Sequence, residues 1–232
     1  MIVRQLDDRL LLITQPAHAH LSRLVMERCV ALRERPRRAS ILHAIGEHDN
    51  GWAEPDAAPE VDPAAGRIYD FVSAPLRVRH GVWPRGVARL AQDPWAAALV
   101  AQHAIAVYDR YRGQPEWDPF FAEMKASRDA LLRASGQARA ELEADYVFVR
   151  LGDLISLLFC TGWTEGQRVG PWSLSTAGTR VIVSPDPFAA AAIPLEIEAR
   201  EIRSGPFRSN TELREALAFA GAVTMSGTAA GN

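Results

Sequence analysis

Residues 138–161 read ARAELEADYVFVRLGDLISLLFCT, and this stretch decides how the rest of the chain is interpreted. Its apolar side chains recur at spacings of three and four residues, which predicts a long helix with one buried face. One acidic residue, Asp153, interrupts the apolar run from Leu151 to Leu158. A buried carboxylate needs a cation or several hydrogen-bond donors, because leaving it unpaired costs several kcal/mol. A metal ion would supply that cation, and Arg150 on the same helix is the alternative.

The chain has 232 residues, of which 48% are apolar and 23% charged, as in an ordinary globular protein. This length allows one large domain, and we expect a single domain over residues 1–232. The formal net charge is −2, so no overall field favours nucleic acid or anionic lipid as a partner. Arginine and alanine are abundant and Lys125 is the only lysine, a bias typical of GC-rich bacterial genomes.

Nothing in the sequence indicates export or a membrane anchor. The first 14 residues contain Asp7, Asp8 and Arg9, which interrupt the apolar run that a signal peptide needs. Cys29 and Cys160 lie far apart, so we expect two reduced thiols rather than a disulfide framework. The expected location is the cytoplasm.

The remaining periodicities predict a mainly α protein. Residues 2–13 resemble a hairpin with a turn at Asp7-Asp8, and residues 14–161 form a helical body. After residue 162 the chain becomes strand-like, with one short helix that starts at Ser209 and a frayed tail after it. We therefore expect an HD-like helical bundle with a small antiparallel sheet. Residues 1–13 and 162–226 would form that β-rich appendage.

Polar groups suited to a metal ion recur on the predicted helices. His18 lies on the first, the pair His48-Asp49 ends the second, His103 lies on a middle helix, and Asp153 lies on the last long one. Imidazole and carboxylate are common ligands of divalent zinc, manganese and iron. A helical bundle can direct such side chains from several helices into one cavity.

The order His, His-Asp, distant Asp resembles the HD superfamily of metal-dependent phosphohydrolases. More closely, several segments resemble the DUF3891 family, which has no established activity, and the likeness covers nearly the whole chain. These segments are QPAHAHLS (15–22), HDNGW (48–52), the helix around His103, LGDLISLLFC (151–160) and SPDPF (184–188). HDNGW is the most specific of them.

The HD resemblance implies a divalent metal ion held by His18, His48, Asp49 and Asp153. Asp49 and His103 would be catalytic, with His103 an added ligand or a general acid. Manganese, iron, zinc and nickel all remain possible. Trp52 and His20 are expected to line the pocket. The resemblance implies a hydrolase, and its substrate would be a small phosphorylated compound, because no strongly basic channel for a polymer is visible.

The phosphate-binding groups are not evident from the sequence. No Gly-rich loop with a lysine marks a phosphate site. Four arginines are candidates, and each is equally well explained as a solvated surface charge. They are Arg23, Arg77, Arg79 and Arg110.

Structural explanations compete with the metal site. His48-Asp49 can be a helix C-terminal cluster, and Asp153 can pair with an arginine. His20, His43 and His80 are best explained as structural residues rather than ligands. The acidic residues Asp56, Glu60 and Asp62 are expected in a solvated loop.

Two other functions stay open. An oxygenase with a di-iron centre would use His103 as an extra ligand. A non-catalytic helical module would keep the polar cluster for folding or for binding a small ligand. The sequence does not define the oligomeric state.

Overall fold

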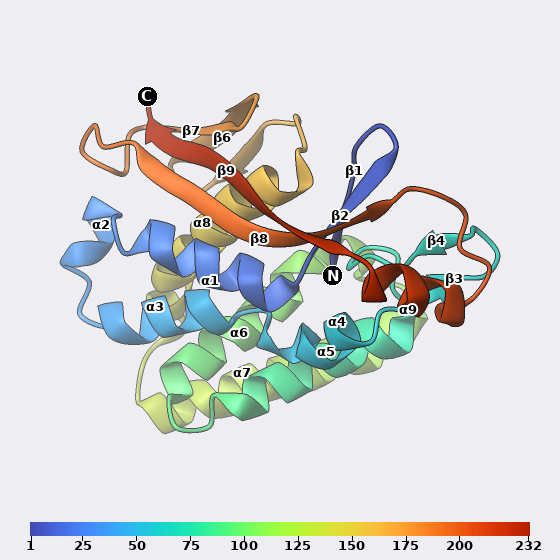
Figure 1. Cartoon of the computed structure of the whole chain (residues 1–232). Helices are drawn as coiled ribbons and strands as arrows, with labels where there is room; N and C mark the ends of the chain where they lie inside the picture. The colour runs from blue at the N-terminus through green and yellow to red at the C-terminus, as the bar shows by residue number, and fades with distance from the viewer.

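The computed structural model describes residues 1–232 and places layers of helices against one face of a seven-stranded sheet (Figure 1). The strand order is β1-β2-β8-β9-β7-β6-β5, and every neighbouring pair is antiparallel except β7 and β9, which are parallel. The strands are β1 (Ile2–Gln5), β2 (Arg9–Ile13), β5 (Gln167–Val169), β6 (Trp172–Ala177), β7 (Arg180–Ser184), β8 (Ile193–Arg203) and β9 (Gly221–Gly231). A separate ribbon consists of β3 (Val61–Asp62) and β4 (Arg67–Ile68).

The helices form the layers beneath the sheet. They are α1 (Gln15–Met26), α2 (Val30–Arg33), α3 (Arg38–Glu47), α4 (Ala53–Ala57), α5 (Leu76–Arg89), α6 (Pro94–Val107), α7 (Asp118–Ser135), α8 (Arg139–Thr161) and α9 (Asn210–Ala218). Three short 3-10 turns are η1 (Asn50–Trp52), η2 (Asp109–Tyr111) and η3 (Pro115–Trp117). No helix combines the length and the apolar character that crossing a bilayer would require.

Local signals in the sequence account for several helix ends. The Thr14 hydroxyl accepts a hydrogen bond from the Ala17 amide at the start of α1, and Asp93 caps α6 in the same way through Ala96. Gly162 ends α8 with a positive φ of 72°, a conformation that glycine adopts at little cost. Such caps satisfy backbone groups that the helix itself leaves free.

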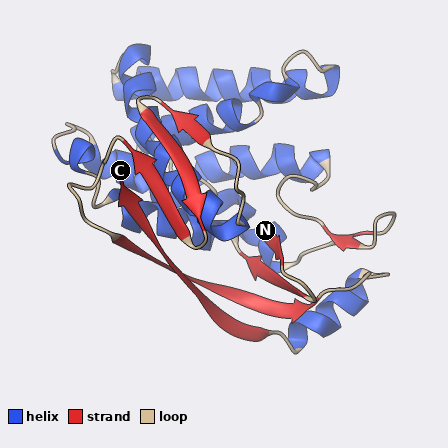
Figure 2. Ribbon diagram, turned by 90° about the horizontal axis from the view of Figure 1, so that it is seen from above, coloured by secondary structure: helices blue, strands red, loops and turns tan.

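The layers share one continuous core. Helix α1 packs against β8, and α8 packs against the strands at both ends of the sheet. Helices α3 and α6 lie behind α1 and α8, and α5 and α7 cover α6 on the far side (Figures 1 and 2). A cluster of 53 buried apolar residues runs through sheet and helices, and both cysteines are buried as free thiols.

The prediction of a mainly α protein with a small antiparallel sheet is wrong. The sheet is large and mixed, and the fold is α/β. The main omission is β9, because GAVTMSGTAAG (221–231) lacks the alternating β-branched pattern of a strand and its end was expected to fray. Its ladders with β8 and β7 connect residues distant in sequence, which local periodicity cannot reveal.

Close packing explains the small residues of β9. A Cβ atom on Gly227 would lie 2.2 Å from the Thr179 carbonyl oxygen and 2.6 Å from the Phe159 ring of α8. The strand can therefore occupy the middle of the sheet only if this position has no side chain.

We predict that Gly227→Ala destabilises the protein by about 1–3 kcal/mol, because the added methyl group overpacks the contact between sheet and helix. Denaturant unfolding followed by circular dichroism would measure the change. Gly221→Ala is the matched control, since a Cβ atom there has no neighbour within 4 Å. Equal stability of the two variants would contradict the central position of β9.

Candidate metal centre

Five polar side chains from four helical segments meet in the interior. His18 comes from α1, His48 and Asp49 from the end of α3, His103 from α6 and Asp153 from α8. All are buried, with at most 6% of the residue exposed. Asp and His are rarely so buried unless they are paired. The tertiary structure thus gathers the residues that the sequence singled out over 136 positions of the chain.

The ligating atoms lie at short range around one centre. His18 Nε2 is 3.2 Å from Asp153 Oδ1, and His48 Nε2 is 3.4 Å from Asp49 Oδ2 and 3.6 Å from Asp153 Oδ1. His103 Nε2 lies 3.8 Å from Asp153 Oδ2. Two overlapping sets, His18/His48/Asp49 and His48/His103/Asp153, have their ligand atoms within 4.8 Å of one another. Either set can hold a metal ion.

Neighbouring groups orient two of the imidazole rings. The Ser156 hydroxyl donates to the His18 carbonyl oxygen at 2.9 Å, so its oxygen accepts the His18 Nδ1 proton at 2.8 Å. His48 Nδ1 donates to the Ile45 carbonyl oxygen at 2.7 Å. Each ring therefore keeps its proton on Nδ1 and turns Nε2 toward the centre, as metal-bound histidines usually do.

The two Nε2 atoms then face each other. His18 Nε2 and His48 Nε2 are 3.2 Å apart, and both present a lone pair when the rings are neutral. Two opposed lone pairs at this distance repel unless a positive charge lies between or beside them. The cluster is thus arranged around a cation, which can be a proton or a metal ion.

The motif HDNGW owes its place to close packing of η1 against α5. A Cβ atom on Gly51 would lie 1.9 Å from the Val82 carbonyl oxygen, so only glycine fits. Arg85 donates to the Gly51 carbonyl oxygen at 2.6 Å. These contacts anchor the chain directly after His48 and Asp49, which fixes the direction in which both side chains point.

The alternative explanation of Asp153, a pair with Arg150 on the same helix, is present in the structure. Arg150, one turn earlier on α8, binds Asp153 Oδ2, while Oδ1 faces His18 and His48. Burial alone would raise the pKa of the Asp153 carboxyl group, but Arg150 and the two histidines outweigh it and hold the pKa well below its usual value. Asp153 is therefore an anion at neutral pH.

The surroundings shift the pKa values of His48 and His103 in opposite directions. Burial disfavours charge on His48, but Asp49 and Asp153 outweigh it and raise its pKa to about 10. Burial dominates at His103 and lowers its pKa to about 3. The centre attracts positive charge, and His103 presents a neutral ring, the form that ligates metals.

The cluster lies at the base of a cavity of about 150 Å³. Aromatic side chains form much of its wall, and three arginines, Arg79, Arg110 and Arg150, also line it. The aromatic lining residues are Trp52, Phe71, Trp83, Tyr108 and Trp163. A small anionic molecule would find carboxylates and imidazoles at the base and guanidinium groups on the walls.

The family model described as "Protein of unknown function (DUF3891)" matches residues 1–204. The chain belongs to this family. The match includes all five residues of the DUF3891 centre and ends before α9 and β9. Searches of curated proteins and of solved structures returned no match. The wider similarity to HD phosphohydrolases stays an expectation from the order of the residues.

Of the other site residues predicted for this DUF3891 protein, one lines the cavity and one does not. Trp52 is buried and lines the cavity, whereas His20 is exposed and lies outside it. Two residues along a helix turn a side chain by about 200°, so His18 and His20 point to opposite faces of α1. His43 contacts Asp93 at 3.0 Å, and His80 stacks on Phe120. Neither belongs to the cluster.

Two supporting residues escaped the sequence analysis. Ser156 contacts His18 Nδ1, and the Tyr146 hydroxyl lies 3.2 Å from His103 Nδ1. Ser156 follows Asp153 by three residues and Tyr146 precedes it by seven. This spacing places all three on the same face of α8. That helical spacing was the available signal.

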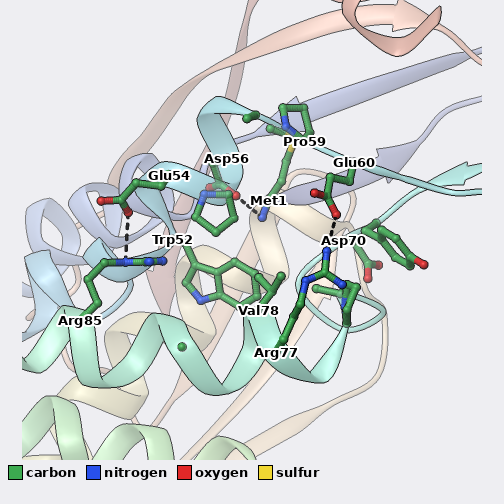
Figure 3. Close-up of a pocket in the computed structure, with 16 residues that line it drawn as sticks. Met1, Trp52, Glu54, Asp56, Pro59, Glu60, Asp70, Arg77, Val78 and Arg85 are labelled. Carbon is green, nitrogen blue, oxygen red and sulfur yellow. Dashed lines mark hydrogen bonds and ion pairs between the residues drawn. The ribbon is translucent and has the colours of Figure 1, made fainter. Parts of the chain in front are cut away.

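A second cavity of about 450 Å³ shares Trp52 with the first in its lining (Figure 3). Asp56 does not lie in a solvated loop as predicted; it is buried there, paired with the Met1 amino group and accepting from the Gln15 amide at 2.5 Å. Glu60 is exposed, as expected, and pairs with Arg77 at 3.1 Å (Figure 3).

We predict that the protein freed of metal by a chelator is most stable near pH 6.5. His48, with its pKa raised from 6.5 to about 10, stabilises fully below pH 6.5, and this contribution is lost as pH rises toward 10. His103, lowered to about 3, instead loses its contribution as pH falls from 6.5. Denaturant unfolding across pH would measure both limbs.

The variant His48→Gln is the control for the alkaline limb and should lack that part of the loss. Histidine NMR of the same metal-free protein reports each ring directly. A His48 ring that loses its proton near pH 6.5 would refute the charge distribution described above.

Proposed function

We propose that this DUF3891 protein is a metal-dependent hydrolase that acts on a small phosphorylated substrate. The observation that carries the proposal is the pair of Nε2 atoms of His18 and His48, turned toward each other 3.2 Å apart beside two buried carboxylates. Their donor set suits zinc, manganese, iron or nickel. A divalent cation bound there would lower the pKa of a water molecule and offset negative charge on a phosphoryl group.

A single ion fits the donors better than two. His48 belongs to both sets of candidate ligands, and its one free nitrogen, Nε2, can serve only one ion. His18, His48 and Asp49 with Asp153 Oδ1 would hold it, and His103 would be an added ligand because its ring is neutral. The general-acid role for His103 is disfavoured for the same reason. Asp49 lines the cavity and is ionised, because its pKa is depressed, so it would serve as an anionic ligand and could accept a hydrogen bond from water.

The volume of the cavity and the arginines that line it indicate the class of substrate. Ligand cavities for drug-sized molecules usually exceed about 300 Å³, and this one holds about 150 Å³. Arginine is the usual partner of phosphate groups, and three line the cavity. A compact anion therefore suits the site, whereas a polymer does not.

A di-iron oxygenase is the second candidate, favoured by the presence of His103 in the cluster. Two ions would require a carboxylate to bridge them, since the imidazoles cannot be shared. The third reading is a non-catalytic module in which the buried cluster binds a small ligand. Metal analysis separates these cases, because iron with a visible absorption band indicates the oxygenase and a protein without stoichiometric metal indicates the module.

We predict that Ser156→Ala weakens metal binding by about 10- to 100-fold, because the His18 ring loses the acceptor that holds its proton on Nδ1. Ser22→Ala is a closely matched control. Both hydroxyls are buried and donate to the His18 carbonyl oxygen, at 2.9 Å from Ser156 and 3.0 Å from Ser22, but only Ser156 contacts the ring. Metal titration with a competing chelator measures both. Equal affinities in the two variants would mean that ring orientation is unimportant.

We predict that His48→Ala and Asp49→Ala each abolish metal retention and turnover of a generic phosphoester with manganese or nickel. The helical circular-dichroism signal should stay largely intact, because both residues follow the last turn of α3. His43→Ala on the same helix is the control and should keep metal and activity. Full metal occupancy in either site variant, or no turnover by the wild type with any of these metals, would refute the hydrolase.

A further inference from the structure

Two arginines of the cavity wall have no carboxylate partner. Arg79 donates through Nη1 to the Tyr111 hydroxyl at 3.2 Å, and Arg110 donates through Nη2 to the same hydroxyl at 3.1 Å. Neither forms an ion pair, whereas the third arginine of the cavity, Arg150, binds Asp153. Arginines around the neighbouring cavity are also paired, Arg77 with Glu60 and Arg85 with Glu54 (Figure 3). The guanidinium groups of Arg79 and Arg110, which both donate to the Tyr111 hydroxyl, therefore have no negative charge paired with them.

One of these guanidinium groups also has a buried donor without a partner. The Nε atom of Arg79 is buried and makes no hydrogen bond. Leaving a buried donor without a partner is costly, so such groups normally bind protein, water or a ligand. Arg79 lines the cavity, and its guanidinium thus has hydrogen-bonding capacity that no protein acceptor uses.

Aromatic rings hold Arg79 in place. Its guanidinium lies over Trp117 and Tyr111, 5.1 Å and 5.4 Å from the two ring centroids. Those two rings are themselves stacked, 4.4 Å apart and nearly parallel. A guanidinium held beside two rings in this way loses little further freedom when it binds a ligand.

Arg79 lines the same cavity as His18, His103 and Asp153. Trp83 follows it by one turn of α5, and the Trp83 ring lies against His103 with 5.6 Å between centroids. One helical turn is about 5.4 Å. A compact ligand can therefore reach from the histidine and carboxylate cluster to the guanidinium group.

We propose that Arg79 and Arg110, linked through Tyr111, form the subsite that binds a dianionic phosphoryl group, so that the substrate is a phosphomonoester. Two uncompensated positive charges match a dianion, whereas a phosphodiester carries one negative charge. The assignment rests on the proposed function for its place in a reaction, but phosphate binding by itself can be measured without turnover.

The test uses inorganic phosphate and dimethyl phosphate as probes, with affinities measured by calorimetry on the full chain at fixed ionic strength. Wild-type protein should bind phosphate more tightly than the monoanionic diester. Arg79→Gln and Arg110→Gln should each weaken phosphate binding by about tenfold or more, the usual effect of losing a charge-assisted hydrogen bond. Arg77→Gln should bind like wild type, because Arg77 is exposed and paired with Glu60 in the other cavity.

Folding is checked by thermal melting. If Arg79→Gln does not fold, Arg110→Gln decides, because Arg110 is exposed and its loss leaves the core unchanged. Arg79→Lys keeps the charge without the planar fork and should show a smaller loss than Arg79→Gln. No saturable binding by wild type, unchanged binding in both glutamine variants, or an equal loss in Arg77→Gln would overturn the subsite.

The outcomes separate this inference from the hydrolase. Phosphoester turnover by wild type together with unchanged phosphate affinity in both glutamine variants would reject the subsite and keep the function. Phosphate binding that depends on Arg79 and Arg110, without turnover under any metal, would keep the subsite and reject the function.

Discussion

The burial of Asp153 is the constraint on which the rest of the centre depends. An anion in the middle of α8 must be balanced, and its two oxygens are balanced differently. Arg150 binds one oxygen from the same helix, and His18 and His48 face the other from α1 and the end of α3. Because desolvation makes an uncompensated charge so costly, these helices are stable together only in an arrangement that brings the histidines to the carboxylate.

Groups that favour a cation and positively charged groups both line the cavity. Two carboxylates and three imidazoles favour a cation at the cluster, whereas Arg79 and Arg110, which also line the cavity, donate to Tyr111 and have no carboxylate partner. A metal ion and a phosphoryl group placed between these groups would attract each other, and both would have protein partners. Trp83, which lies against His103 and lines the cavity, contributes apolar surface to the wall, and an apolar wall strengthens electrostatic interactions beside it.

The sheet serves this centre by holding the helices that carry it. Helices α1 and α8 pack on its inner face and against each other. Strand β9 completes the middle of the sheet, and its small residues allow α8 to approach closely at Gly227. The family match ends before β9, so the part of the chain that contains the cluster is covered by the family and this central strand is not.

The sequence by itself determined which polar residues to expect in the buried cluster and on which helices they lie. Asp153 in an apolar helix, the pair His48-Asp49 and the caps of α1 and α6 are signals within a few residues, and short-range patterns report them reliably. It did not reveal β9, the burial of Asp56 or the outward direction of His20. These depend on contacts between distant segments and on the rotation of a side chain about its helix. Only the tertiary structure decided them, because backbone pairing and charge compensation join groups that no local pattern links.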